Sequence, residues 1–236
     1  MSVYREILKS ECEKMGISLA EDAFARFEAY AAYLIEYNQK VNLTAITEPA
    51  EIAHKHFVDC LLFFKAVQVP QTASLIDVGT GAGFPGVVLK IARPDIQLTL
   101  LDSLNKRLVF LQSLLEKLGL TAEIVHSRAE DGAKPPLREH FDFATARAVA
   151  ALPVLCEYCL PYVKSGGSFV ALKGAMANQE VAAAGRAVQI LGGEKAQLVC
   201  LQTEALGSRG IVTVRKVHHT PPAYPRTAAK ISKQPL

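Results

Sequence analysis

The sequence predicts an α/β protein whose mostly parallel β-sheet is covered by helices on both faces and is preceded by a small helical segment. Between residues 69 and 217, short apolar runs alternate with longer helical patterns, and this alternation is typical of a parallel sheet. The clearest run, residues 75–78, is apolar apart from one acid and ends in a glycine-rich loop, as expected for a strand buried on both faces. A helix should start near Pro85, because proline suits a first helical turn.

The chain divides into three parts. Residues 1–68 form a helical N-terminal extension, residues 69–217 form the α/β domain, and residues 218–236 form a basic, proline-containing tail. In the extension, apolar residues three and four apart predict a helix ending near Asn38, and Thr47 is expected to cap a second helix. Four prolines predict that the tail is not a packed element.

The remaining elements follow from their apolar patterns. Ser103 is expected to cap a helix that Gly119 closes. Strands are predicted at residues 96–101, 122–125, 141–148 and 168–174, helices at 103–118, 152–162 and 178–191, and a hairpin-like pair at 196–202 and 211–217.

Composition excludes several classes of protein. Half of the 236 residues are hydrophobic, so the chain can bury a large core, yet no apolar run approaches the roughly 20 residues of a membrane helix. The charged N-terminus is unlike a signal peptide. Of five cysteines, only Cys156 and Cys159 form a C-x-x-C pair, and their apolar helical setting predicts core packing. We therefore expect no disulfide framework, no metal site and a cytoplasmic location.

The glycine loop indicates the ligand. Asp77, Gly79, Gly81 and Gly83 give D-x-G-x-G-x-G, which departs from the G-x-G-x-x-G of dinucleotide-binding proteins. This form resembles the glycine motif of class I S-adenosylmethionine-dependent methyltransferases. Such a ligand has no phosphate, so the glycines would serve close backbone approach. The alternative is a tight turn that binds nothing.

Two further positions suit a nucleoside. Asp102 ends the next apolar run, about twenty residues beyond Gly83, where an acid can accept hydrogen bonds from both ribose hydroxyls. The following loop, residues 127–131, lies where an adenine ring would sit, and Glu130 or the backbone of Ala129 could hold its amino group. A plain surface turn is the competing interpretation of this loop.

Positive groups at strand ends indicate an acceptor site. Arg147 leaves the strand at 141–148 and Lys173 ends the strand at 168–174. An arginine at an apolar strand end needs a partner or an opening, so either a site role or a structural salt bridge would explain it. His56 and Asp59 are three residues apart and so lie on the same face of a helix. Either they have a functional role or they form a local pair.

The absence of two motifs narrows the choice of methyl acceptor. The chain has no Asp/Asn-Pro-Pro-Tyr-like turn after the fourth strand and no cysteine placed as a pyrimidine nucleophile. A ring nitrogen such as guanine N7 remains, and its methylation needs no general base, only alignment of acceptor and donor. Arg147 and Lys173 would then position guanine O6 or a phosphate rather than abstract a proton.

Charge is unevenly distributed and predicts a polyanionic partner. The net charge is +3, but residues 205–236 hold six Lys/Arg and no acid, which leaves −3 on the rest. A solvated tail is the alternative. The residues expected to contact RNA are Lys40, Asn42, His56, Arg209, Arg226, Lys230 and Lys233.

Several short motifs lie along the chain: NxKxNLT at 38–44, HxxD at 56–59, DVGTGAGFPG at 77–86, LLDS at 100–103, SRAE at 127–130, AR at 146–147, LKG at 172–174 and an ending with YPR at 224–226. Taken together, these motifs resemble the 16S ribosomal RNA guanine-N7 methyltransferase family, also called glucose-inhibited division protein B. The resemblance covers nearly the whole chain. Cys60 departs from the family pattern, where serine is usual, as does Ala229, where glycine is common.

The resemblance implies a Rossmann-like class I methyltransferase that uses S-adenosylmethionine to modify a guanosine near the decoding region of the small subunit. It also implies cofactor contacts at Gly79, Phe84, Ala129, Glu130 and Arg147. The expected partner is small-subunit ribosomal RNA, naked or within a ribosomal particle, with no membrane and a monomeric protein. The rival interpretations are a small-molecule methyltransferase and a non-catalytic RNA-binding protein that keeps the cofactor.

Overall fold

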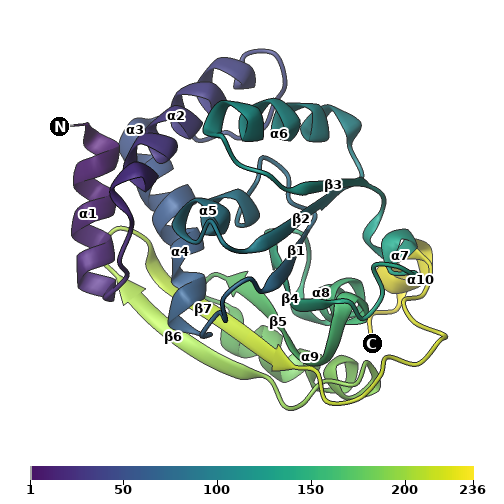
Figure 1. The fold of residues 1–236 in the computed structure, drawn as a ribbon. Coiled ribbons are helices and arrows are strands. Elements are labelled where there is room, and N and C mark those ends of the chain that lie inside the picture. Colours follow the sequence, from purple (N-terminus) through teal and green to yellow (C-terminus); the bar gives the residue numbers. More distant parts are fainter. Residues whose placement is uncertain (1) are drawn as a thin grey trace.

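A seven-stranded sheet organises the protein, as seen in a computed structural model that describes residues 2–236 (Figure 1). Its order is β3-β2-β1-β4-β5-β7-β6. The first five strands are parallel, and β7 and β6 extend the sheet as an antiparallel pair. The predicted fold class and hairpin are confirmed. The strands are β1 (Ser74–Val78), β2 (Gln97–Asp102), β3 (Glu123–His126), β4 (Phe141–Arg147), β5 (Val163–Lys173), β6 (Gln197–Thr203) and β7 (Gly207–Arg215).

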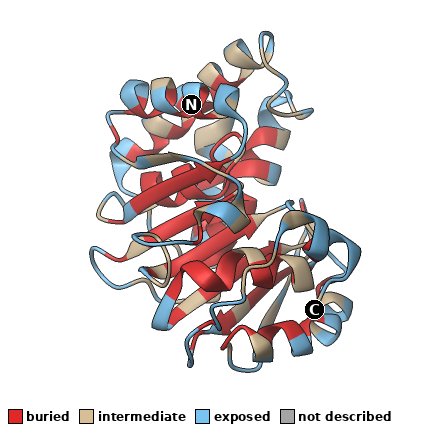
Figure 2. Ribbon diagram, turned by 90° about the vertical axis from the view of Figure 1, so that its right-hand side faces the viewer, coloured by how far each residue is buried: buried red, intermediate tan, exposed pale blue. Residues whose placement is uncertain are grey.

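Helices cover both faces of the sheet, and each face has its own hydrophobic core (Figures 1 and 2). One core joins the sheet to α1 (Val3–Met15), α2 (Glu21–Asn38), a π-helix (Ile52–Val58), α4 (Asp59–Leu61), a 3-10 turn (Leu62–Lys65), α5 (Gly86–Ala92) and α6 (Asn105–Leu118). The short α3 (Pro49–Glu51), which has no buried residue, leads into the π-helix. The other lies under α7 (Ala129–Gly132), α8 (Leu152–Cys159), a 3-10 turn (Leu160–Tyr162) and α9 (Ala177–Ile190). Cys156 and Cys159 are buried free thiols in this second core.

Two predicted helix caps are wrong. The helix near Thr47 begins after Glu48 and has no side-chain cap, and it continues as a π-helix rather than a regular α-helix. The helix near Ser103 begins after Leu104, because Asp102 Oδ1 accepts the Leu104 amide at 2.9 Å and occupies the turn. The predicted ends at Asn38 and Gly119 are confirmed.

The C-terminal segment is packed, contrary to the prediction from its prolines. It ends in α10 (Ala228–Lys233), whose Ile231 is fully buried. Arg226 Nη2 lies 2.6 Å from Oε2 of Glu157, a carboxylate in α8 with no exposed surface. Arg138 also donates to the carbonyls of Thr220 and Tyr224, at 2.8 Å each. Charged contacts to carbonyls and to a buried acid, together with the burial of Ile231, bind this segment to the domain.

The N-terminal extension supports the glycine loop directly. Tyr30 of α2 is fully buried, stacks on Phe84 at 5.3 Å between ring centroids, and donates its hydroxyl to the carbonyl of Ala82. Phe57 packs on the same tyrosine at 5.4 Å. The extension therefore forms part of the structure that positions the loop after β1.

Replacing Tyr30 with phenylalanine is expected to lower the free energy of unfolding by about 1–2 kcal/mol, because the buried Ala82 carbonyl loses its donor. Urea unfolding measures this change. The matched control is Tyr33→Phe, since Tyr33 stacks on Phe110 and its hydroxyl has no hydrogen-bond partner within residues 2–236. Equal losses in the two variants would contradict the assigned bond.

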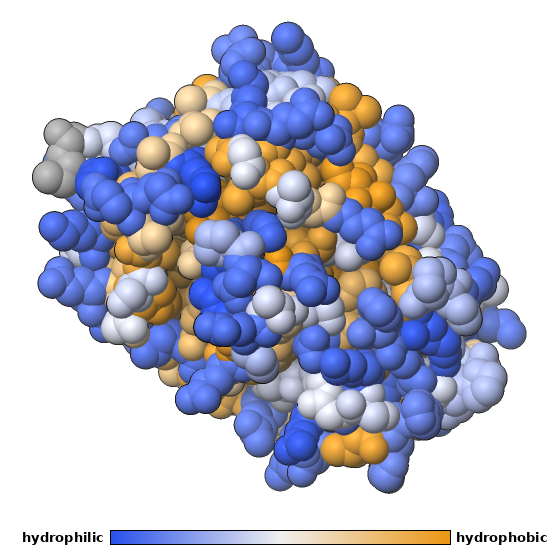
Figure 3. Space-filling view, viewed as in Figure 1, coloured by the Kyte–Doolittle hydropathy of each residue, from blue (hydrophilic) through white to orange (hydrophobic). Residues whose placement is uncertain are grey.

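One face of the molecule carries both hydrophilic and hydrophobic residues. Figure 3 shows hydrophilic residues over most of the margin of one face and hydrophobic residues grouped nearer its centre. No helix among residues 2–236 is long and apolar enough to cross a membrane.

Candidate active site

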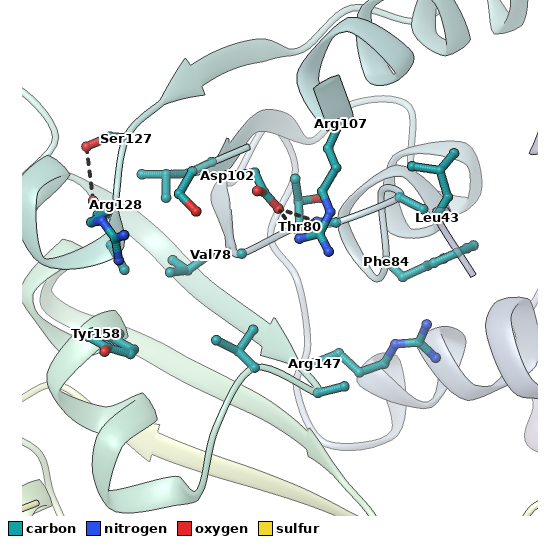
Figure 4. A pocket seen from close by; sticks show the side chains of 18 of the residues that line it. Leu43, Val78, Thr80, Phe84, Asp102, Arg107, Ser127, Arg128, Arg147 and Tyr158 are labelled. Atoms are coloured by element: carbon teal, nitrogen blue, oxygen red, sulfur yellow. Dashed lines mark hydrogen bonds and ion pairs between the residues drawn. The ribbon is translucent and has the colours of Figure 1, made fainter. Parts of the chain in front are cut away.

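A cavity of about 530 Å³ opens at the carboxyl ends of β1, β2 and β4 (Figure 4). Strand order reverses at β1, and ligands bind at such points of parallel sheets. The cavity is elongated: Arg128 and Tyr158 lie at one end, and Leu43 and Phe84 at the other. Its volume suits a molecule of nucleoside size.

Most of the predicted cofactor residues meet at this cavity. Its wall includes Gly79, Gly81, Phe84, Asp102, Ala129, Glu130 and Arg147, together with His56. Leu43, Thr44 and Arg128 also line it and belong to segments that the sequence already marked, the motif at 38–44 and the loop at 127–131, whereas Arg107 and Tyr158 were not predicted. Thr44 lies in the motif at 38–44, which was a usable signal, whereas nothing local marks Tyr158. Asp77 and Gly83 do not line the wall, so the structure corrects their predicted direct contacts.

Asp77 holds the glycine loop from below. Its side chain is fully buried, and its Oδ2 accepts the Thr80 hydroxyl at 2.7 Å and the Gly86 amide at 2.8 Å. Its Oδ1 is buried without a hydrogen-bond partner in the part of the chain that the structure describes. Burial outweighs the two hydrogen bonds and raises the pKa of the Asp77 carboxyl from its usual 3.8 to about 6.

This raised pKa makes stability depend on pH. The native state favours the protonated acid, so Asp77 contributes stability that is complete below pH 3.8 and is lost as pH rises through about 6. Two pKa units correspond to about 3 kcal/mol. Relative to Asp77→Asn, wild-type unfolding free energy should therefore fall by about that amount between pH 4 and pH 7. Urea titrations of both ligand-free proteins measure it, and a pH-independent difference would contradict the raised pKa.

Two glycines are required by close approach rather than by the ligand alone. At Gly83, with φ +98°, a Cβ would lie 2.7 Å from the Tyr30 hydroxyl. At Gly79, with φ +73°, it would lie 2.9 Å from a methyl group of Val149. The loop after β1 is thus fitted between α2 and the loop after β4.

Asp102 is nearly buried at the centre of the cavity wall. Its Oδ2 accepts the Gly81 amide at 2.9 Å and Arg107 Nη1 at 3.2 Å, and Figure 4 shows Arg107 pointing from α6 toward it. A carboxylate has about four lone-pair positions, and these bonds and the Leu104 amide occupy three. Asp102 can still accept a ribose hydroxyl.

Arg147 joins the N-terminal extension to the sheet. Its Nη1 donates to the Lys55 carbonyl at 2.8 Å and to Asp59 Oδ2 at 2.9 Å, and its Nη2 lies 3.2 Å from His56 Nδ1. The guanidinium also lies over the Phe84 ring at 5.0 Å. His56 and Asp59 therefore meet through Arg147 rather than as a local pair. Arg147 is both a cavity wall and a salt-bridge partner, so neither of its two expected roles excludes the other.

A second cavity of about 390 Å³ adjoins the first and shares Arg147 and Ala148 with it. Lys173 lies here, 2.7 Å from Glu180 and 2.7 Å from the carbonyl of Ala150. Ala148 has φ +56°, a strained conformation of the kind that gathers at functional sites. Arg209 also lines this second cavity, and its Nε–H donates to Asp59 Oδ1 at 2.7 Å.

The predicted RNA contacts separate into two groups. Lys40, Asn42, Lys230 and Lys233 are exposed. His56 is largely buried and stacks on Phe84 at 4.4 Å. Arg209 and Arg226 are engaged by Asp59 and the buried Glu157, and for Arg226 the structure corrects the prediction, because its guanidinium neutralises a carboxylate that would otherwise be buried unpaired.

A glycine loop after β1, an acid at the end of β2 and a seven-stranded sheet with an antiparallel end define a class I S-adenosylmethionine-dependent methyltransferase. Solved structures share this fold. A methyltransferase from Pyrococcus furiosus matches with a TM-score of 0.57 at 12% identity, over 82% of this chain and 99% of that one. A SAM-dependent O-methyltransferase from Thermotoga maritima matches with a TM-score of 0.54 at 17% identity, over 79% and 72%.

The chain belongs to the rRNA small subunit methyltransferase G family, whose family model matches residues 23–212. The ribosomal RNA small subunit methyltransferase G of Clostridium perfringens (strain 13 / Type A) is 46% identical over 236 residues, covering 99% of both chains. That of Desulfitobacterium hafniense (strain Y51) is 49% identical over 228 residues, covering 95% of this chain and 94% of the other. S-adenosylmethionine is the cofactor, and the resemblance stated from the motifs is confirmed.

Proposed function

We propose that this protein transfers a methyl group from S-adenosylmethionine to N7 of a guanosine in 16S ribosomal RNA. The observation that carries the proposal is the pair of adjoining cavities with Arg147 as their common wall. One is of nucleoside size and holds the ribose-type acid Asp102, and the other is lined by three cations.

The first cavity suits the cofactor. Asp102 would hold the ribose, Ala129 and Glu130 would hold the adenine beside Tyr158, and Gly79 and Gly81 would lie against the methionine part. When bound, the cofactor supplies an electrophilic methyl group. The protein orients it, encloses it and excludes water.

The second cavity suits an acceptor that loses no proton. Asp59 is bound by two arginines, and Glu180 by Lys173 and the Leu152 amide, so neither carboxylate is available as a base. Burial and then the charge of Arg147 lower the pKa of His56 to about 4, and its Nδ1 already faces that guanidinium. Guanine N7 has a free lone pair that would form the bond to the methyl carbon while the carbon–sulfur bond of the donor breaks. No proton is lost, so no base is needed, which agrees with this set of engaged groups.

Positive groups position the RNA. Arg147 and Lys173 would hold guanine O6 or a phosphate of the acceptor nucleotide. The exposed Lys40, Asn42, Lys230 and Lys233 would contact phosphates farther along the strand. We also propose that the protein acts as a monomer in the cytoplasm, on naked RNA or on a ribosomal particle.

The decisive experiment uses small-subunit RNA and particles from cells that lack the protein, incubated with purified enzyme and methyl-labelled S-adenosylmethionine. Mass spectrometry of the nucleosides should show 7-methylguanosine, and Asp102→Ala should show none. Label in a small-molecule extract but not in RNA would favour the small-molecule enzyme. Cofactor binding without turnover on any RNA would favour a non-catalytic binder.

A further inference from the structure

Thr44 lines the cofactor cavity beside Leu43, and its hydroxyl has an unusual set of neighbours. Thr44 Oγ1 lies 2.9 Å from Nε2 of His56. It also accepts the amide of Ile46 at 3.0 Å. Neither His56 nor Ile46 was predicted to bind the cofactor, yet His56 connects Thr44 to Arg147, which was.

The direction of each hydrogen bond follows from chemistry. A guanidinium only donates, so His56 Nδ1 must accept from Arg147 Nη2, 3.2 Å away. A neutral imidazole that accepts at Nδ1 carries its proton on Nε2, which then donates to Thr44 Oγ1. The Ile46 amide is the second donor to the same oxygen.

His56 is neutral under ordinary conditions. Burial and the charge of Arg147 lower its pKa to about 4. The charged groups that face the ring are Arg147 and, more weakly, Asp59, whose carboxylate is itself bound by Arg147 and Arg209. A second proton on the ring would place two cations in contact, so the Nε2–H tautomer is the stable form.

Both lone pairs of the Thr44 oxygen are therefore occupied, and its own hydrogen has no acceptor within residues 2–236. A hydroxyl in this state can only donate. It would form a hydrogen bond with an oxygen acceptor in the cavity but not with an amino group, which presents hydrogens.

We propose that Thr44 is a donor-only hydroxyl that recognises an oxygen acceptor at the Phe84 end of the cavity. Two oxygens have this chemistry: O6 of the target guanine, or the carboxylate of the methyl donor. The guanine assignment rests on the proposed function and adds a reason for base choice, because adenine carries an amino group where guanine carries O6. The carboxylate assignment depends only on the cofactor.

The hydrogen-bond direction is tested on the wild-type protein by ¹⁵N NMR of the His56 ring. The expected result is a neutral ring protonated at Nε2 between pH 5.5 and pH 8. A ring protonated at Nδ1, or an imidazolium at neutral pH, would overturn the proposal. This measurement requires no variant to fold and no RNA to be methylated.

The role is tested by comparing Thr44→Ser, which keeps the hydroxyl, with Thr44→Val, which keeps the shape. The serine variant should keep kcat/KM within about threefold of wild type, whereas the valine variant should lose on the order of 10- to 100-fold in kcat/KM. If the acceptor is the cofactor carboxylate, valine weakens the calorimetric Kd for S-adenosylhomocysteine by this factor. If it is guanine O6, that Kd is unchanged and the loss lies in the RNA reaction.

A valine variant equal to wild type on both measurements, or a serine variant as weak as valine, would refute the donor role. A wild-type protein that binds cofactor but forms no 7-methylguanosine would instead refute the proposed function. In that case a valine effect on the S-adenosylhomocysteine Kd would still support Thr44 as a cofactor contact.

Discussion

Arg147→Lys is expected to lower kcat/KM for RNA methylation by on the order of 100-fold, or about 2.7 kcal/mol of transition-state stabilisation. Lysine keeps the charge, but its donors all leave one nitrogen, so it cannot reproduce the bonds that Arg147 makes from Nη1 to the Lys55 carbonyl and Asp59 and from Nη2 to His56. It also has no planar face to present to Phe84. Both cavities would lose their common wall. Single-turnover and steady-state assays on small-subunit RNA measure the change.

The matched control is Arg186→Lys, at an exposed position of α9 away from both cavities. Its activity should stay within about twofold of wild type. Because Asp59 keeps Arg209 as a partner, Arg147→Lys should remain folded by circular dichroism. Activity within threefold of wild type would show that charge alone at this position suffices.

Arg226→Met is expected to cost about 3–5 kcal/mol of unfolding free energy, the largest effect we expect on stability. The change leaves Glu157, which has no exposed surface, as a buried carboxylate without its guanidinium partner. Urea unfolding measures the loss. Methionine keeps an unbranched apolar stem at this position and removes the charge together with its hydrogen bonds to Glu157.

The double variant Glu157→Met/Arg226→Met should recover most of that loss, because no buried charge then remains. Lys233→Met, an exposed change in α10, should alter stability by less than about 0.5 kcal/mol. If Arg226→Met were as mild as Lys233→Met, the C-terminal segment would contribute nothing through this pair.

Local patterns were sufficient for the sheet and much of the cavity. The strand and loop around Gly79 and the acid at Asp102 each depend on a few neighbouring residues, and both lie on the cavity wall. Periodicity also predicted α2, because its buried face repeats at helical spacing.

Ion pairs between residues far apart in the chain could not be predicted from the sequence. Glu157 and Arg226 are 69 residues apart, and Asp59 and Arg209 are 150 apart, so no spacing rule connects them. For the C-terminal segment the prolines signalled an irregular backbone correctly but said nothing about the buried acid that fixes it. Asp77 was placed beside the ligand because its motif is shared with binding loops, whereas the structure buries it under the loop, bonded to Thr80 and to the first residue of α5.

The double engagement of Asp59 limits how this enzyme can exchange parts with its relatives. One carboxylate from the N-terminal extension binds an arginine at the end of β4 and another in β7. A chimera that receives a foreign N-terminal third would have to inherit matching arginines from two separate gene segments. Recombination breakpoints near residue 68 should therefore be poorly tolerated, and a library of chimeras should recover activity mainly when Asp59, Arg147 and Arg209 come from the same parent.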